Sequence, residues 1–184
     1  MNIKHLTTEE LEAGMKDIYL SPKDNGAIEM IVRRPEDEKR EVLSEAKLDL
    51  TEGLVGDNWK ARGSKSTSDG SAHPEMQINI MNSRMIALLA QEKERWQLAG
   101  DQLFIDMDLS AENVPAGTRL ALGSAILEIT AKPHSGCKKF AARFGQDAII
   151  FVNSPLGKEL HLRGVNTKVI QSGTIRVGDI VKKI

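Results

Sequence analysis

Short segments in which apolar and polar residues alternate recur along this chain after residue 26. Alternation with a period of two predicts strands that bury one face. Turns rich in Gly, Pro, Asn and Asp separate these segments and helical periodicity is scarce, which is typical of a barrel or a sandwich. The clearest predicted strands cover residues 27–32, 77–81, 102–106 and 126–129.

Two strand–turn–strand segments near the C-terminus resemble each other. Residues 117–124 and 173–179 each begin with Gly-Thr, continue with alternating apolar residues and reach a Gly-centred turn, after which a second apolar strand follows. No third copy occurs, so these are two similar elements and not a solenoid repeat. Upstream, residues 41–48 alternate weakly and are expected to pair with the strand at 27–32.

A few helices are expected around these strands. Residues 7–10 (Thr-Thr-Glu-Glu) have capping-box spacing, and apolar residues follow at helical intervals, which predicts an N-terminal helix that ends before Pro22. A polar residue just before position 84 is placed to cap a second helix over residues 84–96. A third, short helix is expected to start at Cys137.

The bulk composition is that of an ordinary soluble globular protein. Of the 184 residues, 40% are hydrophobic and 28% are charged, and the formal net charge is −1, whereas a nucleic-acid binder usually shows a strongly basic face. The first ten residues lack the apolar core of a signal peptide, and no apolar run approaches the ~18 residues of a membrane span. We therefore expect a cytoplasmic protein with no nucleic-acid or membrane partner, and a single unpaired cysteine fits that compartment.

Cys137 is the only cysteine, and its neighbours are basic. One thiol cannot form an intramolecular disulfide, so it is either a buried filler or a reactive group. A position at a helix start, with Lys138, Lys139 and His134 nearby, favours a thiolate. Gly136 allows a tight turn that presents the sulfur. The sequence thus marks Cys137 as a candidate reactive residue.

Three generic alternatives are weaker. Gly53-x-x-Gly56-Asp57 lacks the Gly-Lys-Ser/Thr ending of a P-loop and the third glycine of a dinucleotide fingerprint. A zinc site on His134 and Cys137 has no CxxC pair or HxxxH helix to support it. The spacing of these two residues is also not one that cysteine hydrolases require, because the fold sets the partners in those enzymes.

Several motifs occur in one order and together resemble the MOSC domain, the C-terminal module of molybdenum-cofactor sulfurases that is also found as small stand-alone proteins. The resemblance covers residues 26–184, which leaves residues 1–25 as an N-terminal helical extension. It implies a mainly β fold, a closed or partly open barrel with a few peripheral helices. The motifs are Gly53-Leu54-Val55-Gly56-Asp57, Gln77-Ile78-Asn79-Ile80, Gly100-Asp101-Gln102-Leu103, Leu120-x-Leu122-Gly123, Cys137, Arg163-Gly164-Val165 and Gly178-Asp179.

The resemblance implies that Cys137 carries sulfur as a persulfide or ligates the molybdenum of a pterin cofactor. Two details depart from the family pattern: Gly100-Asp101-Gln102-Leu103 stands where Gly-Glu-Asn-Leu is frequent, and Ser135-Gly136-Cys137 replaces the usual Pro-Cys. The chain also lacks the aminotransferase-like domain that binds pyridoxal phosphate, so a persulfide would have to come from a partner such as a cysteine desulfurase.

Further residues are expected to complete this site, some by binding the cofactor's phosphate or another oxyanion and others by contacting the pterin or orienting the thiol. Two other functions stay open: a non-catalytic module that binds an oxyanion or cofactor, and a reductase component. A reductase would need an external redox partner, because the sequence has no iron–sulfur, flavin or dinucleotide motif. The expected anion-binding residues are Lys138, Lys139, Arg143 and Arg163, and those expected near the pterin or thiol are Asp57, His134 and His73, the last as a cap on the pocket.

Overall fold

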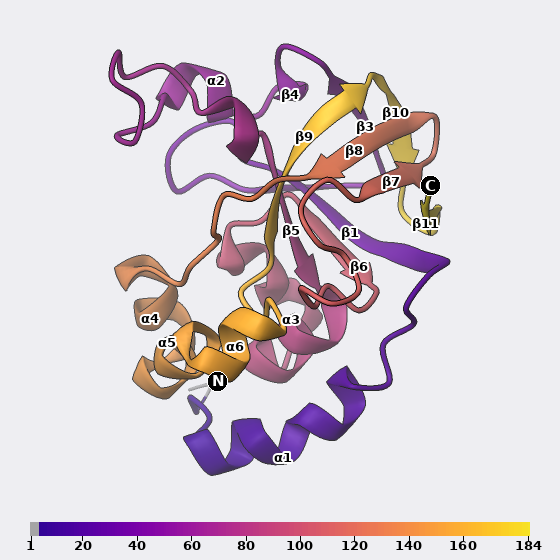
Figure 1. Ribbon diagram of the computed structural model, residues 1–184. Coiled ribbons are helices and arrows are strands. Elements are labelled where there is room, and N and C mark those ends of the chain that lie inside the picture. Colours follow the sequence, from indigo (N-terminus) through magenta and orange to yellow (C-terminus); the bar gives the residue numbers. More distant parts are fainter. Residues whose placement is uncertain (1–3) are drawn as a thin grey trace.

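Seven strands close into a barrel in the computed structural model, which describes residues 4–184 (Figure 1). Each strand pairs with the next in the order β1–β6–β5–β9–β8–β7–β11, and β11 pairs back with β1. Of these pairings, only that of β5 with β6 is parallel. The predicted mainly β barrel is confirmed, and it is closed. The barrel strands are β1 (Gly26–Arg33), β5 (Ile78–Asn82), β6 (Leu103–Asp106), β7 (Arg119–Leu122), β8 (Ala125–Ile129), β9 (Val165–Gln171) and β11 (Ile180–Lys183).

A second, three-stranded sheet has the order β10–β3–β4, and β2 lengthens the edge of the barrel at β1. The predicted pairing of residues 41–48 with β1 holds only for β2; β3 instead pairs with β10. β7 and β8 form the hairpin that their sequence suggests. Their C-terminal counterparts differ, because β10 and β11 lie in separate sheets. The additional strands are β2 (Glu41–Leu43), β3 (Glu45–Asp49), β4 (Gly53–Leu54) and β10 (Gly173–Arg176).

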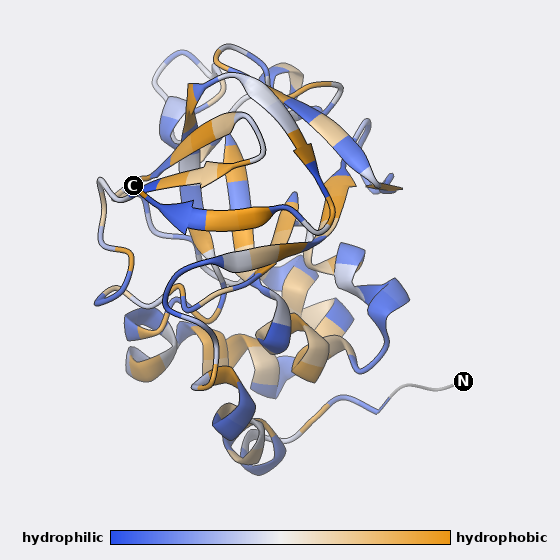
Figure 2. Cartoon of the chain, turned by 90° about the vertical axis from the view of Figure 1, so that its right-hand side faces the viewer, coloured by the Kyte–Doolittle hydropathy of each residue, from blue (hydrophilic) through white to orange (hydrophobic). Residues whose placement is uncertain are grey.

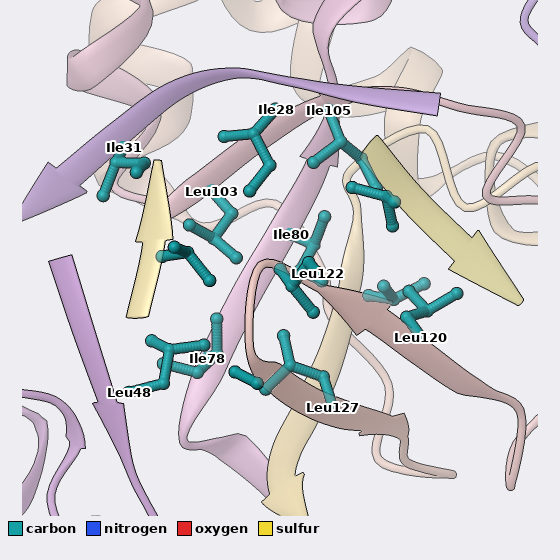
Figure 3. Packing of buried hydrophobic residues seen from close by; sticks show 14 of the residues in the cluster. Ile28, Ile31, Leu48, Ile78, Ile80, Leu103, Ile105, Leu120, Leu122 and Leu127 are labelled. Atoms are coloured by element: carbon teal, nitrogen blue, oxygen red, sulfur yellow. The ribbon is translucent and has the colours of Figure 1, made fainter. Parts of the chain in front are cut away.

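Strand β5 separates two apolar cores. Ile78 and Ile80 point into the barrel, while Met81 belongs to the core beneath the helices. On β1, a register shift between Ile28 and Met30 lets Ile28 and Ile31 both face the barrel interior despite their odd spacing. Figure 3 shows branched aliphatic side chains from the surrounding strands filling this interior.

All helices except α2 gather at one end of the barrel, where their apolar faces turn inward, while α2 lies at the other end near β4 (Figures 1 and 2). The predicted capping box begins α1: Thr7 Oγ1 accepts from Glu10 N at 3.3 Å, and Thr7 N donates to the Glu10 carboxylate at 2.8 Å. Leu11 and Met15 of α1 are buried in the helical core. The helices are α1 (Thr8–Ile18), α2 (Trp59–Arg62), α3 (Ser83–Ala90), α4 (Lys138–Phe144), α5 (Gln146–Asn153) and α6 (Pro155–Glu159), with 3₁₀ turns η1 (Pro74–Met76) and η2 (Lys93–Ala99).

The helix predicted over residues 84–96 is interrupted. Asn82 caps α3 as expected, accepting from the backbone of the first turn. The helix ends at Ala90, because the C-cap residue Gln91 has a left-handed backbone with φ of 63°. Residues 93–99 then form η2. Within residues 4–184, no helix has the length and apolar character that a membrane crossing needs. The division of the chain at residue 25 stays a prediction.

Candidate functional site

Cys137 lies where the extended chain leaving β8 turns into α4. It is the N-cap residue of α4, with φ of −117°, and it is exposed to solvent. Phe140 and Phe144 are buried with ring centroids 5.0 Å apart and anchor α4 to the helical core. The exposure of the thiol excludes the interpretation of Cys137 as a buried filler.

A cavity of about 260 Å³ opens beside Cys137, and we call it the arginine pocket. Its basic side chains come from four separate stretches of chain: the loop after β1, the end of α2, helix α4 and the residue before Gly164. Because no one stretch supplies the set, the fold assembles the positive charge. The charged lining residues are Arg34, Arg40, Arg62, Lys139, Arg143 and Arg163, with Glu36 and Asp37 as the acidic members.

Asp57 holds one of these arginines in place. Its fully buried carboxylate accepts from Arg34 Nε at 2.9 Å and from Arg34 Nη2 at 2.8 Å, a bidentate pair. Oδ1 also accepts from Trp59 N at 3.0 Å, and Oδ2 from Arg34 N at 2.9 Å. The sequence placed Asp57 near a ligand, and the structure places it behind Arg34, off the cavity lining.

Asp101 joins two predicted site residues. It is fully buried; Oδ2 accepts from Arg163 Nη1 at 2.6 Å, and Oδ1 lies 2.9 Å from His134 Nε2. Arg163 is itself buried, donates to Ala99 O and stacks over the Phe140 ring at 4.8 Å. Asp101 was not predicted as a site residue, although it belongs to the Gly100-Asp101-Gln102-Leu103 motif.

The charges of this buried group follow from its geometry. Burial alone would raise the pKa of Asp101, but Arg163 and His134 outweigh that effect and hold it below its usual range. Burial, reinforced by the positive charge of Arg163, lowers the pKa of His134, so the imidazole is neutral at pH 7. A carboxylate only accepts, so His134 Nε2 carries the proton and Nδ1 is left as an acceptor.

An acidic segment approaches the pocket from the loop after β1. Glu38 accepts from Arg143 Nη2 at 2.6 Å and from Lys139 Nζ, and Asp37 lies 3.3 Å from the same ammonium. Glu38 adopts a left-handed backbone with φ of 58°. Lys139 and Arg143 were predicted to bind an anion, and in the structure they hold carboxylates of this loop. Those carboxylates are solvent-exposed, so each pair contributes little to stability.

Two arginines of the pocket have no such partner. Among residues 4–184, no carboxylate lies within ion-pair distance of Arg40 or Arg62. Burial, together with the positive charges of Arg143 and Arg34, lowers the pKa of Arg40. This side of the pocket therefore carries positive charge that an anion would neutralise.

The two remaining predicted residues lie away from the lining. His73 caps η1, where its Nδ1 accepts from Glu75 N at 3.2 Å. Lys138 is exposed on α4. Neither residue lines the arginine pocket. The sequence also missed Arg34, Arg40 and Arg62, because arginines in polar loops give no signal of what they face after folding.

The donor set of the pocket suits an anionic heterocycle with a soft metal. A thiolate is a soft ligand, and planar guanidinium groups bind phosphate in a bidentate manner. Two polar atoms of lining residues are buried without partners in residues 4–184: Arg163 Nε lacks an acceptor and Asn58 Oδ1 lacks a donor. Over the same residues, no three His, Cys, Asp or Glu side chains converge as a metal site of their own. A metal here would have to arrive with ligands of its own.

Comparison with solved structures shows the same fold in bacterial proteins. The YuaD protein of Bacillus subtilis superposes with a TM-score of 0.58 at 15% identity, covering 86% of this chain and 95% of that one. YiiM of Escherichia coli superposes with a TM-score of 0.54 at 20% identity, covering 86% of this chain and 69% of that one. YiiM of Geobacillus stearothermophilus superposes with a TM-score of 0.56 at 13% identity, covering 86% of this chain and 75% of that one. No curated protein matches the chain.

The amino-acid sequence also matches a family model. The model of the MOSC domain matches residues 67–182, more than half of the chain. That segment contains Cys137, His134, Asp101 and Arg163. The chain therefore belongs to the MOSC domain family, a module associated with the molybdenum cofactor.

Proposed function

We propose that the arginine pocket binds the molybdenum cofactor through its phosphate, with Cys137 as the protein ligand of the metal. One observation carries the proposal: the only thiol of the chain is exposed on the wall of a cavity that six basic side chains line. When bound, the cofactor supplies a molybdenum centre for redox or sulfur chemistry.

The unpaired groups of the pocket support this choice of ligand. Arg40 and Arg62, which have no carboxylate partner in residues 4–184, would bind the phosphate. Arg163 Nε and Asn58 Oδ1 are a donor and an acceptor left without partners there. A pterin offers both acceptors and donors, whereas an unprotonated oxyanion such as molybdate offers acceptors alone. An unpaired buried polar group costs about 1–3 kcal/mol, so a ligand that pairs with it gains affinity.

The buried Asp101 determines which ring nitrogen of His134 carries the proton. Because Asp101 fixes the proton on Nε2, His134 presents an unprotonated Nδ1, to which no residue in 4–184 donates a hydrogen bond. At neutral pH, His134 thus accepts a hydrogen bond or a proton and adds no positive charge. The charge that holds the anion comes from the arginines.

The acidic loop makes the pocket responsive to its ligand. Glu38 occupies Arg143 and Lys139 through exposed ion pairs, which are weak individually. A phosphate near these side chains would compete with Glu38 for them. Arg40 and Arg62 would therefore bind the phosphate first. Lys139 and Arg143 of α4 would bind it afterwards, as Glu38 moves away.

The test is the molybdenum and pterin content of the protein purified from a host that makes the cofactor. We expect near-stoichiometric pterin in the wild type and at least a tenfold lower pterin content in Arg40→Gln/Arg62→Gln, because the variant loses two charge-assisted hydrogen bonds of about 1.5–3 kcal/mol each. Arg176→Gln is the matched control, since Arg176 pairs with exposed Glu45 on the second sheet. A wild type without pterin, or a double variant that retains wild-type content, would contradict the proposal.

A second function, sulfane-sulfur carriage, is favoured by the exposure of Cys137 to a partner protein. The Cys137 thiolate would attack the outer sulfur of a donor persulfide, a new S–S bond would form, and the donor would leave as a thiolate as its own S–S bond breaks. Intact mass after incubation with a cysteine desulfurase and cysteine tests this. A gain of one sulfur in the wild type and none in Cys137→Ser supports carriage; an unchanged wild-type mass rejects it.

A further inference from the structure

A second and larger cavity lies next to the arginine pocket. Its volume is about 580 Å³, within the range of about 300–1,000 Å³ that is typical of small-molecule sites. The two cavities share one lining residue, His134. Among residues 4–184, neither Cys137 nor any arginine lines the larger cavity, so its chemistry differs from that of the arginine pocket.

The walls of this cavity are mostly apolar. They combine the loop before β7, the end of β8, one side of α5 and the start of β9. Val152 and Val165 are buried contributors, whereas Ala111, Ala116 and Ala131 are exposed at its margin. Such walls suit a ligand with an apolar body.

The charged groups of the cavity all have one sign. Lys132 and Lys158 line it, and no aspartate or glutamate of the described chain does. Neither lysine forms an ion pair with any residue in the range 4–184. Cavities that carry one sign of charge beside low-dielectric walls concentrate ions of the opposite sign. The ligand that matches is therefore an anion.

Side-chain amides hold the dividing wall in position. Asn166 is fully buried, and its Nδ2 donates to the carbonyl oxygens of Lys132 and Pro133 at 3.0 Å each. Asn153 accepts from Gly136 N at 2.9 Å and donates to Gly136 O at 3.2 Å. The cavity is thus formed before a ligand arrives, which lowers the entropy cost of binding.

We propose that this cavity is a second ligand site, which binds a small organic anion with an apolar body, such as an aromatic carboxylate. The apolar walls bind the body of the ligand, and Lys132 and Lys158 attract its anionic group. This site does not depend on the molybdenum cofactor, so it stands or falls separately from the function proposed for the arginine pocket.

The test uses protein labelled with ¹³C at alanine methyl groups and titrated with 2-naphthoate, or with neutral 2-naphthamide of nearly the same shape. We expect saturable shifts at Ala111, Ala116 and Ala131, which line the cavity, and none at Ala46, which is buried in the barrel. Naphthoate should bind at least fivefold more tightly than naphthamide.

Two variants separate charge from shape. Lys132→Met/Lys158→Met keeps the apolar stems and should reduce the preference for naphthoate to near onefold, while Lys47→Met/Lys182→Met, at exposed positions outside the cavity, should leave it unchanged. Ala116→Trp, at an exposed position, should block binding of both compounds. Absence of saturable shifts at the cavity alanines, equal affinity for the two compounds, or wild-type binding by Ala116→Trp would overturn the proposal.

Discussion

Replacing Asp101 with asparagine is the substitution that most directly challenges the buried group behind the arginine pocket. The variant keeps the shape of the side chain and removes its charge. Asp101 is 0% exposed and Arg163 7%, so the guanidinium would lose its counter-charge in a site with little access to water. An amide nitrogen facing Arg163 Nη1 would also set donor against donor across the present 2.6 Å contact.

The expected cost follows from this burial. Removing one partner of a buried ion pair costs about 3–5 kcal/mol, and we take about 3 kcal/mol because the oxygen of the new amide would still accept from His134. In a chain of this size, that lowers Tm by about 6–12 °C. Urea unfolding followed by tryptophan fluorescence gives the free energy of unfolding.

A matched control distinguishes burial from charge loss alone. Asp106→Asn breaks a pair with Arg84 whose side chains are 28% and 32% exposed, and it should cost less than about 1 kcal/mol. Adding Arg163→Met to Asp101→Asn should recover part of the loss, because the uncompensated charge is gone. If Asp101→Asn and Asp106→Asn cost the same, or if the second substitution gives no recovery, the reasoning is wrong.

Three further predictions concern pH, backbone space and capping. Burial, with the neighbouring guanidinium of Arg163, lowers the pKa of His134 in the folded protein below its ordinary value of 6.5. As the pH falls, the unfolded chain therefore binds the proton first, so the free energy of unfolding should rise with pH just below 6.5. Urea titrations at several pH values should show this slope in the wild type and a flatter slope in His134→Gln. Gly164 has φ of 110°, and a Cβ there would lie 2.2 Å from Ile80 O, so Gly164→Ala should lower the free energy of unfolding by at least about 2 kcal/mol. Gly178→Ala, with φ of 92° and open space around it, should cost clearly less, and equal urea midpoints would contradict the steric argument. Asn82→Ala removes the α3 cap and two buried amide bonds, and we expect a loss of about 2–3 kcal/mol together with faster amide exchange in the first turn of α3; unchanged exchange would contradict the capping role.

Local patterns in the sequence predicted most elements of the fold. Alternation identified six of the seven barrel strands but not β9, and the capping box placed the start of α1. Strand partners were harder, because alternation shows that a face is buried but not which strand lies beside it. For this reason β10 was expected to resemble the β7–β8 hairpin, yet it pairs with β3 in another sheet. The break at Gln91 was missed because no glycine or proline marks it.

The site residues also fall into those that the sequence predicted and those that it did not. Cys137, His134 and Arg163 were found from a local motif and from the ordered resemblance. Asp57 was quoted for the same reason, but only the structure shows that it supports Arg34 from behind. Residues that meet through folding alone, such as Arg34, Arg40 and Arg62, lie in polar loops or at a helix end and carry no local periodicity.

The central claim is that Cys137 ligates molybdenum in the arginine pocket. X-ray absorption at the molybdenum edge tests it most directly, on wild-type protein and on Cys137→Ser purified from the same cofactor-producing host. We predict molybdenum in the wild type with one more sulfur neighbour than in Cys137→Ser. A wild type without molybdenum, or the same sulfur shell in both proteins, would contradict the claim.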